Sequence, residues 1–215
     1  MKSVLCFGDS NTWGSSTVPP EPGGRYAPDI RWPGVLRAAL GTDWTVVEEG
    51  LPARTTVHAD PVEGSYMSGA AYFLPCLRSH RPLDVVVIML GTNDLKARFA
   101  LQPLDIAAGV GQLLRILEAA ECGVGGGVPK ALVVCPPPLL ADMGTGNGFP
   151  MMFAGGYEKS LALLPHYEKV CAAHGAALLD AGAIIASSRF DGLHLDPEAH
   201  ATLGRAVAAR VAALV

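Results

Sequence analysis

Short runs of consecutive apolar residues recur along the chain, separated by longer segments whose apolar residues have helical spacing. The runs are rich in β-branched residues and predict buried strands at residues 4–7, 44–47, 85–89, 131–135 and 177–179. The clearest helical stripe predicts a helix over residues 103–120. Asp196 and Pro197 suit the N-cap and the first position of a last helix. This alternation predicts an α/β fold with a mostly parallel sheet and right-handed crossovers.

Two stretches rich in proline and glycine interrupt this alternation. They cover residues 15–29 and 136–156, and each follows the end of a predicted strand. Loops of this length in a compact domain usually have a function, and open α/β sheets bind their ligands at the carboxyl ends of their strands. The sequence contains no internal repeat and no linker, so we expect residues 1–215 to form one domain.

Charge and hydropathy limit the kinds of partner. The formal net charge is −4 at pH 7, and no run of Lys or Arg provides the basic surface that nucleic-acid binding needs. The apolar run at residues 85–90 is far shorter than the roughly 20 residues of a membrane-spanning helix. We therefore expect a small-molecule substrate and neither nucleic acid nor a membrane as a partner.

The cysteines and the first residues bear on the cellular compartment. The five cysteines are scattered and form no Cys-x-x-Cys pair, so their spacing suggests neither a disulfide framework nor a thiolate zinc site. The apolar run at residues 4–7 is too short for the central region of a signal peptide. These features predict a cytoplasmic protein with reduced, mostly buried cysteines.

Glycine-rich and polar segments stand where the predicted strands end. They are residues 8–12, 50–56 and 91–94, together with residues 191–194 just before the last helix. The carboxyl ends of parallel strands meet at one edge of a sheet. A serine hydroxyl, an amide side chain, turn backbone and an Asp-x-x-His pair are therefore expected to meet at that edge.

Three side chains of these segments could form a nucleophile with its activating groups. Ser10 lies at a turn into a predicted helix start, where free backbone N–H groups favour negative charge. Serine is a weak nucleophile and needs a base, which the imidazole of His194 can supply. Asp191, three residues before His194, is the nearest carboxylate that could orient the ring.

An acyl-transfer site also needs donors for the oxygen that becomes negatively charged. The backbone N–H groups of Ser10 and Ala53 and the side-chain amide of Asn93 are the candidates. One such donor can be worth about 3 to 4 kcal/mol of the barrier. The sequence thus predicts an oxyanion hole with three donors.

The four segments resemble, in the same order, the four sequence blocks of the SGNH (GDSL) hydrolases. Residues 5–14, 48–56 and 89–94 are similar in particular to the bacterial arylesterase and acyltransferase branch of that family. One departure is Ala53, because the family usually has glycine at the matching position. The N–H of Ala53 survives this change, but the methyl group narrows the hole.

The resemblance implies a three-layer, flavodoxin-like sandwich with a five-stranded, mostly parallel sheet. It also implies metal-free ester hydrolysis without a cofactor, with Ser10 as the nucleophile, His194 as the base and Asp191 as its partner. Family members frequently form homo-oligomers, and loops frame a restricted pocket. We therefore expect the protein to self-associate.

Several residues beside the predicted site are candidates for substrate contact: Asp9, Trp13, Lys96, Phe149, Phe153 and Leu193. The aromatic ones serve equally well as core or interface residues. Asp9 is better suited to fix the turn before Ser10 than to carry a proton. Arg54 is expected to be structural, paired with Glu48 or Glu49.

The leading hypothesis is a serine esterase for small, short-acyl esters, aryl esters included, with acyl transfer to alcohols as a second activity. A carbohydrate O-deacetylase on the same scaffold is the alternative, although an aromatic content of 7% offers few surfaces for sugar stacking. A metallophosphoesterase would need a clustered histidine ligand set, which the sequence lacks. A serine nucleophile of the α/β-hydrolase kind would need a Gly-x-Ser-x-Gly motif. A binding module without activity would be expected to lack Ser10, Asp191 or His194, and the sequence contains all three.

Overall fold

A computed structural model describes residues 1–17, 24–143 and 149–215 of the chain. Its centre is a five-stranded sheet in the order β2-β1-β3-β4-β5, with every neighbouring pair parallel. The strands are β1 (Lys2–Gly8), β2 (Trp44–Gly50), β3 (Val85–Met89), β4 (Lys130–Cys135) and β5 (Ala177–Asp180). All residues of β3 are buried, as its continuous apolar run predicted. The α/β fold with a parallel five-stranded sheet is thus confirmed.

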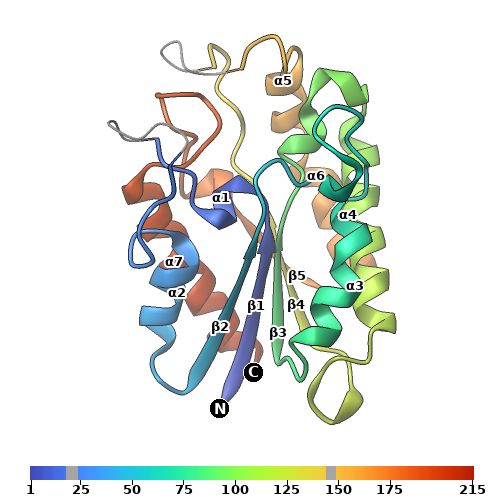
Figure 1. Ribbon diagram of the computed structural model, residues 1–215, viewed down its shortest axis with the longest axis vertical. Helices are drawn as coiled ribbons and strands as arrows, with labels where there is room; N and C mark the ends of the chain where they lie inside the picture. Colours follow the sequence, from blue (N-terminus) through green and yellow to red (C-terminus); the bar gives the residue numbers. More distant parts are fainter. Residues whose placement is uncertain (18–23, 144–148) are drawn as a thin grey trace.

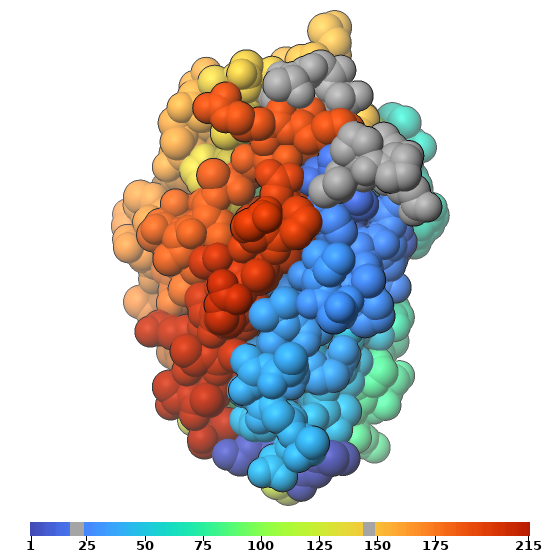
Figure 2. Space-filling model, turned by 90° about the vertical axis from the view of Figure 1, so that its left-hand side faces the viewer, coloured from blue at the N-terminus to red at the C-terminus, as the bar shows by residue number. Residues whose placement is uncertain are grey.

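Helices cover both faces of the sheet and make the molecule a three-layer sandwich (Figure 1). One face carries α2 (Trp32–Leu40) and α7 (Pro197–Leu214), which lie side by side in Figure 2. The opposite face carries α3 (Gly69–Ser79), α4 (Pro103–Ala119) and α6 (Leu164–His174). Two apolar clusters form the core, one on each side of the sheet. No described helix is long and apolar enough to cross a membrane.

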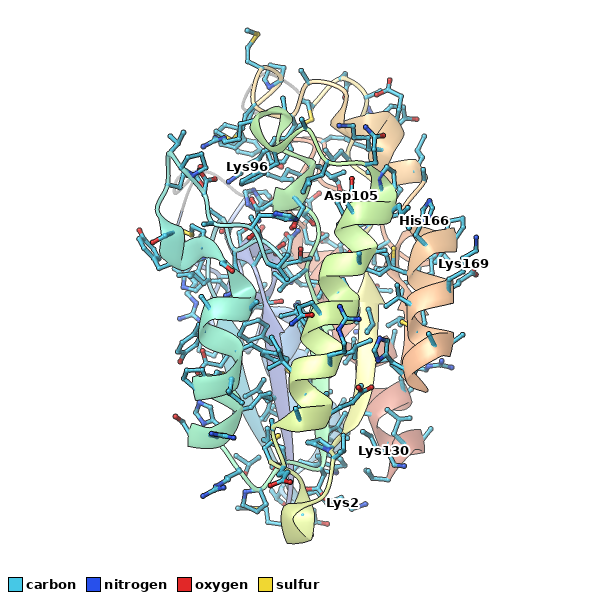
Figure 3. All side chains as sticks on the ribbon, turned by 90° about the vertical axis from the view of Figure 1, so that its right-hand side faces the viewer. Lys2, Lys96, Asp105, Lys130, His166 and Lys169 are labelled. Atoms are coloured by element: carbon cyan, nitrogen blue, oxygen red, sulfur yellow. The ribbon has the colours of Figure 1, made fainter. Side chains whose placement is uncertain are left out.

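The short elements lie mostly in the connections at the carboxyl edge of the sheet. They are α1 (Ser10–Trp13), α5 (Gly156–Leu161) and the single-turn helices η1 (Ser65–Met67), η2 (Asn93–Leu95), η3 (Ala97–Phe99), η4 (Val124–Gly126) and η5 (Ala181–Ala183). The exception is η4, which lies near the amino end of β4. Figure 3 shows the two edges by their lysines: Lys96 lies at the carboxyl edge, and Lys2 and Lys130 lie at the far end. The chain termini lie at that far end as well (Figure 1).

Helix α1 sits directly on the ends of β1 and β2. A Cβ atom added to Gly50 would lie 2.1 Å from the backbone nitrogen of Trp13, and one added to Gly8 would lie 2.0 Å from Thr12 Oγ1. Only glycine at these two positions lets the helix approach so closely. The first residue of α1, Ser10, is thereby placed at the carboxyl edge of the sheet.

The last helix begins where the sequence predicted, but its cap differs. Asp196 is the N-cap and Pro197 is the first residue of α7, yet the Asp196 side chain makes no capping hydrogen bond. Instead its Oδ1 accepts hydrogen bonds from Thr17 Oγ1 at 2.5 Å and Ser188 Oγ at 2.6 Å. Asp196 therefore joins the loop after α1 to the loop before α7.

Neither predicted long loop contains a strand within its described part. Residues 18–23 and 144–148 of these loops, with their prolines and glycines, lie outside the described residues. The described remainder of both loops reaches the carboxyl edge of the sheet, where Ser15, Phe149 and Phe153 line a pocket. Both loops therefore contribute to the site described below.

Candidate active site

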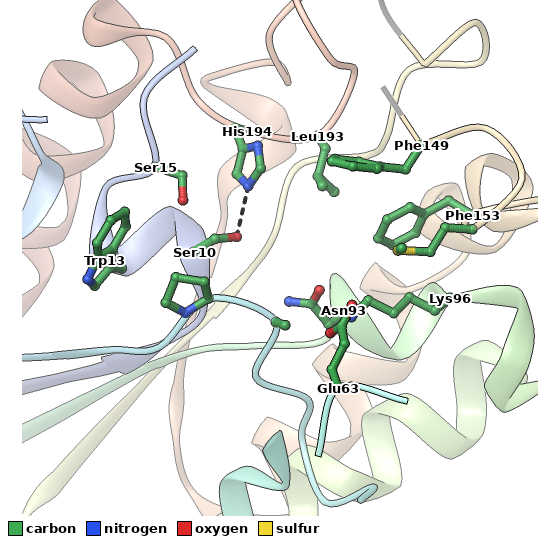
Figure 4. A pocket seen from close by; sticks show the side chains of 13 residues that line it. Ser10, Trp13, Ser15, Glu63, Asn93, Lys96, Phe149, Phe153, Leu193 and His194 are labelled. Carbon is green, nitrogen blue, oxygen red and sulfur yellow. Dashed lines mark hydrogen bonds and ion pairs between the residues drawn. The ribbon is translucent and has the colours of Figure 1, made fainter. Parts of the chain in front are cut away.

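Four segments that are distant in the sequence meet at the carboxyl edge of the sheet, as Figure 4 shows. Ser10 comes from α1, Ala53 from the loop after β2, Asn93 from η2 and His194 from the loop before α7. All four residues line the same pocket. The convergence predicted for the strand ends is therefore present in the structure.

Ser10, His194 and Asp191 form a continuous chain of hydrogen bonds. His194 Nε2 lies 3.0 Å from Ser10 Oγ, and His194 Nδ1 lies 2.6 Å from Asp191 Oδ2. With a proton on Nδ1, the ring donates to the carboxylate and its Nε2 accepts from the serine hydroxyl. This is the geometry in which a histidine can remove the proton of a serine.

Backbone groups hold Asp191 in place. Its Oδ1 accepts hydrogen bonds from the N–H groups of Leu193 and His194, both at 2.9 Å. Burial alone would raise the pKa of this carboxyl, but the hydrogen bond and charge of His194 and the two N–H groups outweigh burial and lower it. Asp191 thus stays ionised over a wide pH range.

The turn that carries Ser10 is fixed by its neighbours. Asp9 is the N-cap of α1, and its carboxylate accepts from the N–H of Asn11 at 2.9 Å. The Asn11 side chain donates to the carbonyl oxygen of Leu193 at 3.3 Å, which ties the serine turn to the histidine loop. Burial raises the pKa of Asp9 to about 6. Asp9 is buried and is not among the residues that line the pocket, so the predicted substrate contact does not fit its position.

The candidate oxyanion donors lie on three different elements. Ala53 has φ +68°, a left-handed conformation that costs an alanine about 1 kcal/mol and that glycine adopts freely. This conformation explains why glycine is usual at the matching family position. The Asn93 amide donates to the carbonyl oxygen of Arg54 at 3.2 Å, next to Ala53. Asn93 is therefore fixed to the same turn that presents the Ala53 N–H.

Arg54 and Asp94 hold the turn of Ala53 in place through hydrogen bonds. The buried guanidinium of Arg54 donates to the carbonyl oxygen of Gly8 at 2.8 Å and to that of Glu49. Asp94 accepts from the N–H of Thr56 at 2.9 Å and from its hydroxyl at 2.5 Å. The turn is thus attached to the end of β1 and to η2.

The structure changes the expected partners of Arg54. Glu48 pairs with three other arginines: its carboxylate lies 2.5 Å from Arg31 Nε, 2.6 Å from Arg37 Nη2 and 3.8 Å from Arg25 Nη2. At Glu49, Arg54 donates to the backbone carbonyl oxygen. Arg54 is structural as predicted, but its guanidinium donates hydrogen bonds to backbone carbonyl oxygens, and the Glu49 carboxylate acts on it only through its charge.

The pocket has a volume of about 300 Å³ and is mainly apolar. Five predicted contact residues line it: Trp13, Lys96, Phe149, Phe153 and Leu193. Sequence reasoning missed four others, namely Ser15, Pro52, Glu63 and Met152. Ser15, Pro52 and Met152 stand in segments already singled out as loops or blocks, whereas Glu63 lies in the connection between β2 and α3 and carried no signal.

A buried ion-pair cluster forms the polar side of the pocket. Lys96 Nζ lies 2.5 Å from Glu63 Oε2 and 3.6 Å from Asp60 Oδ2, and the Lys96 side chain is only 2% exposed. Arg98 also contacts both carboxylates. The cluster joins the connection after β2 to the segment after β3. Lys96 therefore lines the pocket and is held in place by Asp60 and Glu63.

Comparison with known proteins places the chain in a family. The family model described as GDSL-like Lipase/Acylhydrolase matches residues 6–202. A carbohydrate acetylesterase from Sinorhizobium meliloti is 44% identical over the whole of both chains, with a TM-score of 0.93. The aryl esterase of M. smegmatis has the same identity, coverage and TM-score. No curated protein shows significant similarity.

A third solved structure, of a carbohydrate acetylesterase family member from Sinorhizobium meliloti, is 35% identical. It covers 100% of this chain and 99% of its own, with a TM-score of 0.92. These similarities extend over the whole chain, as the resemblance of the four sequence blocks to the SGNH hydrolases implied. The chain therefore belongs to the GDSL-like lipase/acylhydrolase family and is a carboxylic ester hydrolase.

Proposed function

We propose that the protein hydrolyses small esters with short acyl groups, aryl esters among them, through an acyl-enzyme on Ser10. The observation that carries this proposal is the hydrogen-bonded series from Ser10 through His194 to Asp191, which opens into a mainly apolar pocket. The similarity to the aryl esterase of M. smegmatis supports aryl esters as substrates.

The proposed reaction has two halves that use the same groups. Ser10 Oγ attacks the ester carbonyl carbon while His194 Nε2 takes the hydroxyl proton. The carbonyl π electrons move to the oxygen, and a tetrahedral intermediate forms. When the intermediate collapses, the bond to the alcohol oxygen breaks and His194 returns the proton to that oxygen. Water then attacks the acyl-enzyme with His194 as base, which releases the acid and restores Ser10.

Charge stabilisation accompanies each half. The N–H groups of Ser10 and Ala53 and the Asn93 amide donate to the oxyanion, and each donor contributes about 3 to 4 kcal/mol. Asp191 keeps the imidazole in the required tautomer and stabilises the imidazolium form. Because Arg54 links the turn of Ala53 to Gly8 and to Asn93, the donors need little reorganisation during the reaction.

The pocket lining favours short acyl groups and flat leaving groups. Met152, Phe153 and Leu193 surround a space of about 300 Å³, at the lower end of ligand-site sizes. Trp13 lies across Ser10 from Leu193 and Phe153 in Figure 4, where an aryl ring can contact it. We expect activity to fall sharply as the acyl chain lengthens beyond a few carbons.

Burst kinetics test the proposal. Wild-type enzyme mixed with excess p-nitrophenyl acetate should release a rapid burst of nitrophenol if acylation precedes slower hydrolysis. Ser10→Ala should abolish burst and turnover while leaving the unfolding curve nearly unchanged. Acetyl transfer to Ser10 should appear in the mass of the quenched wild-type protein. Turnover by Ser10→Ala at the wild-type rate would reject the mechanism.

A carbohydrate O-deacetylase is the second candidate. It is supported by the Glu63 and Lys96 ion pair, which gives an otherwise apolar pocket a polar side for hydroxyl groups, and by the similar acetylesterase from Sinorhizobium meliloti. Comparing kcat/KM for acetylated sugars and p-nitrophenyl acetate separates the two. If sugars are the natural substrates, Glu63→Gln should lower kcat/KM for acetylated sugars and leave kcat/KM for p-nitrophenyl acetate unchanged.

We also propose acyl transfer to alcohols as a side activity. The apolar side chains Trp13, Phe149 and Phe153 around Ser10 favour an alcohol over water near the acyl-enzyme. Product analysis with added alcohol measures this partition. Without a preference, alcohol and water would react with the acyl-enzyme in proportion to their hydroxyl concentrations. An ester yield no greater than this proportion would exclude a preference for transfer.

A further inference from the structure

A second group of reactive side chains lies outside the pocket, between the end of β2 and helix α3. It consists of Glu49, Cys76 and His80, whose ligand atoms all lie within 4.8 Å of one another. His80 Nε2 is 3.0 Å from Glu49 Oε1. None of the three lines the catalytic pocket, so the proposed esterase mechanism does not use them.

The helix brings two of these side chains to one stripe. Tyr72, Cys76 and His80 follow one another at intervals of four residues along α3 and its C-cap, so they project on the same side of the helix. That side faces Glu49, the penultimate residue of β2. The Tyr72 hydroxyl interacts with both Glu49 and Cys76. Four polar groups from two elements therefore converge on one point.

The donor set matches the preferences of zinc. Thiolate, imidazole and carboxylate are its usual protein ligands, with bonds of roughly 2.0 to 2.3 Å. A tetrahedral ion then holds its ligand atoms about 3.3 to 3.8 Å apart, so side-chain shifts of about 1 Å would close the observed group around a metal. We propose that Glu49, Cys76 and His80 form a binding site for a zinc-like divalent cation, with a water in the fourth position.

Access and charge are consistent with this site. The side chains of His80 and Glu49 are 33% and 19% exposed, whereas Cys76 is fully buried, so a cation reaches the thiol from the solvent side. Binding replaces the thiol proton by a metal–sulfur bond and releases that proton to solvent. The carboxylate and thiolate then balance the two charges of the ion, next to the guanidinium of Arg54.

The site would add a metal link between the edge strand β2 and helix α3, which already meet through the hydrogen bond between Glu49 and His80. Glu49 immediately precedes Gly50, on which α1 packs, and Arg54 binds the Glu49 carbonyl oxygen. Coordination at Glu49 therefore restrains the base of the turn that carries Ala53. The ion would act on the position of this turn and not on the ester itself, because none of its ligands lines the pocket in which esters are proposed to react.

Cobalt is a direct probe, because a cobalt–thiolate bond gives a charge-transfer band in the near ultraviolet. Metal-free protein titrated with Co²⁺ should develop this band with a stoichiometry of one ion per chain, and Zn²⁺ should remove it. Cys76→Ser should abolish the band. Cys135→Ser is the matched control. Cys135 lies on β4, away from the proposed site, but it is buried like Cys76, and burial raises the pKa of both thiols to about 12. It should leave the band unchanged.

Thermal unfolding gives a second readout. Zn²⁺ should raise the Tm of the wild-type protein in a concentration-dependent way, and this rise should be absent in Cys76→Ser. His80→Gln, a change at a partly exposed residue, should weaken Co²⁺ binding by at least about tenfold, since even the loss of a group that only supports a ligand costs that much.

The outcomes separate this site from the esterase proposal. Ser10→Ala should bind Co²⁺ as the wild type does, whether or not Ser10 is the nucleophile. A wild-type spectrum without a thiolate band at excess Co²⁺, or a band that persists in Cys76→Ser, would overturn the site. A Zn²⁺-dependent rise in Tm that survives in Cys76→Ser would do the same.

Discussion

The guanidinium of Arg54 donates a hydrogen bond to the carbonyl oxygen of Gly8 at 2.8 Å, which connects the turn carrying Ala53 to the strand that leads into Ser10. The Arg54 carbonyl oxygen in turn accepts from the Asn93 amide. One buried residue therefore contacts the supports of all three candidate oxyanion donors. Its removal should disturb their relative positions more than it disturbs substrate binding.

Arg54→Met should lower kcat by about a hundredfold with a smaller change in KM, because misplacing catalytic groups by about 1 Å has that effect. Steady-state kinetics with p-nitrophenyl acetate measure both parameters. Arg37→Met is the control. Like Arg54, Arg37 binds strand β2, through Glu48, but it does not touch the turn that carries Ala53. Equal kcat values for the two variants would show that Arg54 does not position the donors.

Ala53→Gly should stabilise the protein by about 1 kcal/mol, because glycine adopts the observed φ of +68° without the steric cost that alanine has there. Its N–H remains, so turnover of p-nitrophenyl acetate should persist. Urea unfolding measures the gain. Ala100→Gly is a matched control outside the pocket, with φ +53°, and should gain similar stability. A loss of stability in Ala53→Gly alone would contradict the strain argument.

Asn93→Ala should lower kcat by roughly 10² to 10³, the loss expected for one oxyanion donor. The substitution also removes the hydrogen bond to Arg54, so its unfolding free energy must be measured alongside the kinetics. A well-folded variant with a decrease of less than about tenfold would exclude Asn93 from the oxyanion hole.

Asp9 makes stability depend on pH. Burial raises its pKa from 3.8 in a model peptide to about 6, so the folded protein binds the proton more tightly than the unfolded chain. For an acid shifted in this direction, the stabilising contribution is present at low pH and is lost as the pH rises from about 4 to about 6.

Asp9→Asn tests this dependence because asparagine keeps an oxygen that can accept from the Asn11 N–H. Its unfolding free energy, relative to that of the wild type, should increase by up to about 3 kcal/mol between pH 4 and pH 7. Urea unfolding at several pH values measures the difference. A difference that does not change with pH would mean that Asp9 has an ordinary pKa in the folded protein.

Apolar patterning carried most of the information about the fold. The buried strands β3 and β4 and helix α4 differ from their predicted ranges by a residue at most, since each has a continuous apolar run or a clear stripe. Asp196 shows the limit of local reasoning. It occupies the N-cap position, but its carboxylate accepts hydrogen bonds from Thr17 and Ser188 instead of capping the helix. Such partners are distant in sequence, so no local pattern indicates them.

The amino-acid sequence alone determined which chemical groups stand at the strand ends, because a parallel sheet sends all those ends to one edge. Ser10, Asn93 and His194 could be identified in this way. Only the tertiary structure decided that His194 Nε2 lies 3.0 Å from Ser10 Oγ and that Glu63 faces the pocket. It also decided that Cys76 meets Glu49, because side-chain contacts depend on how each connection packs across the sheet, which sequence spacing does not encode.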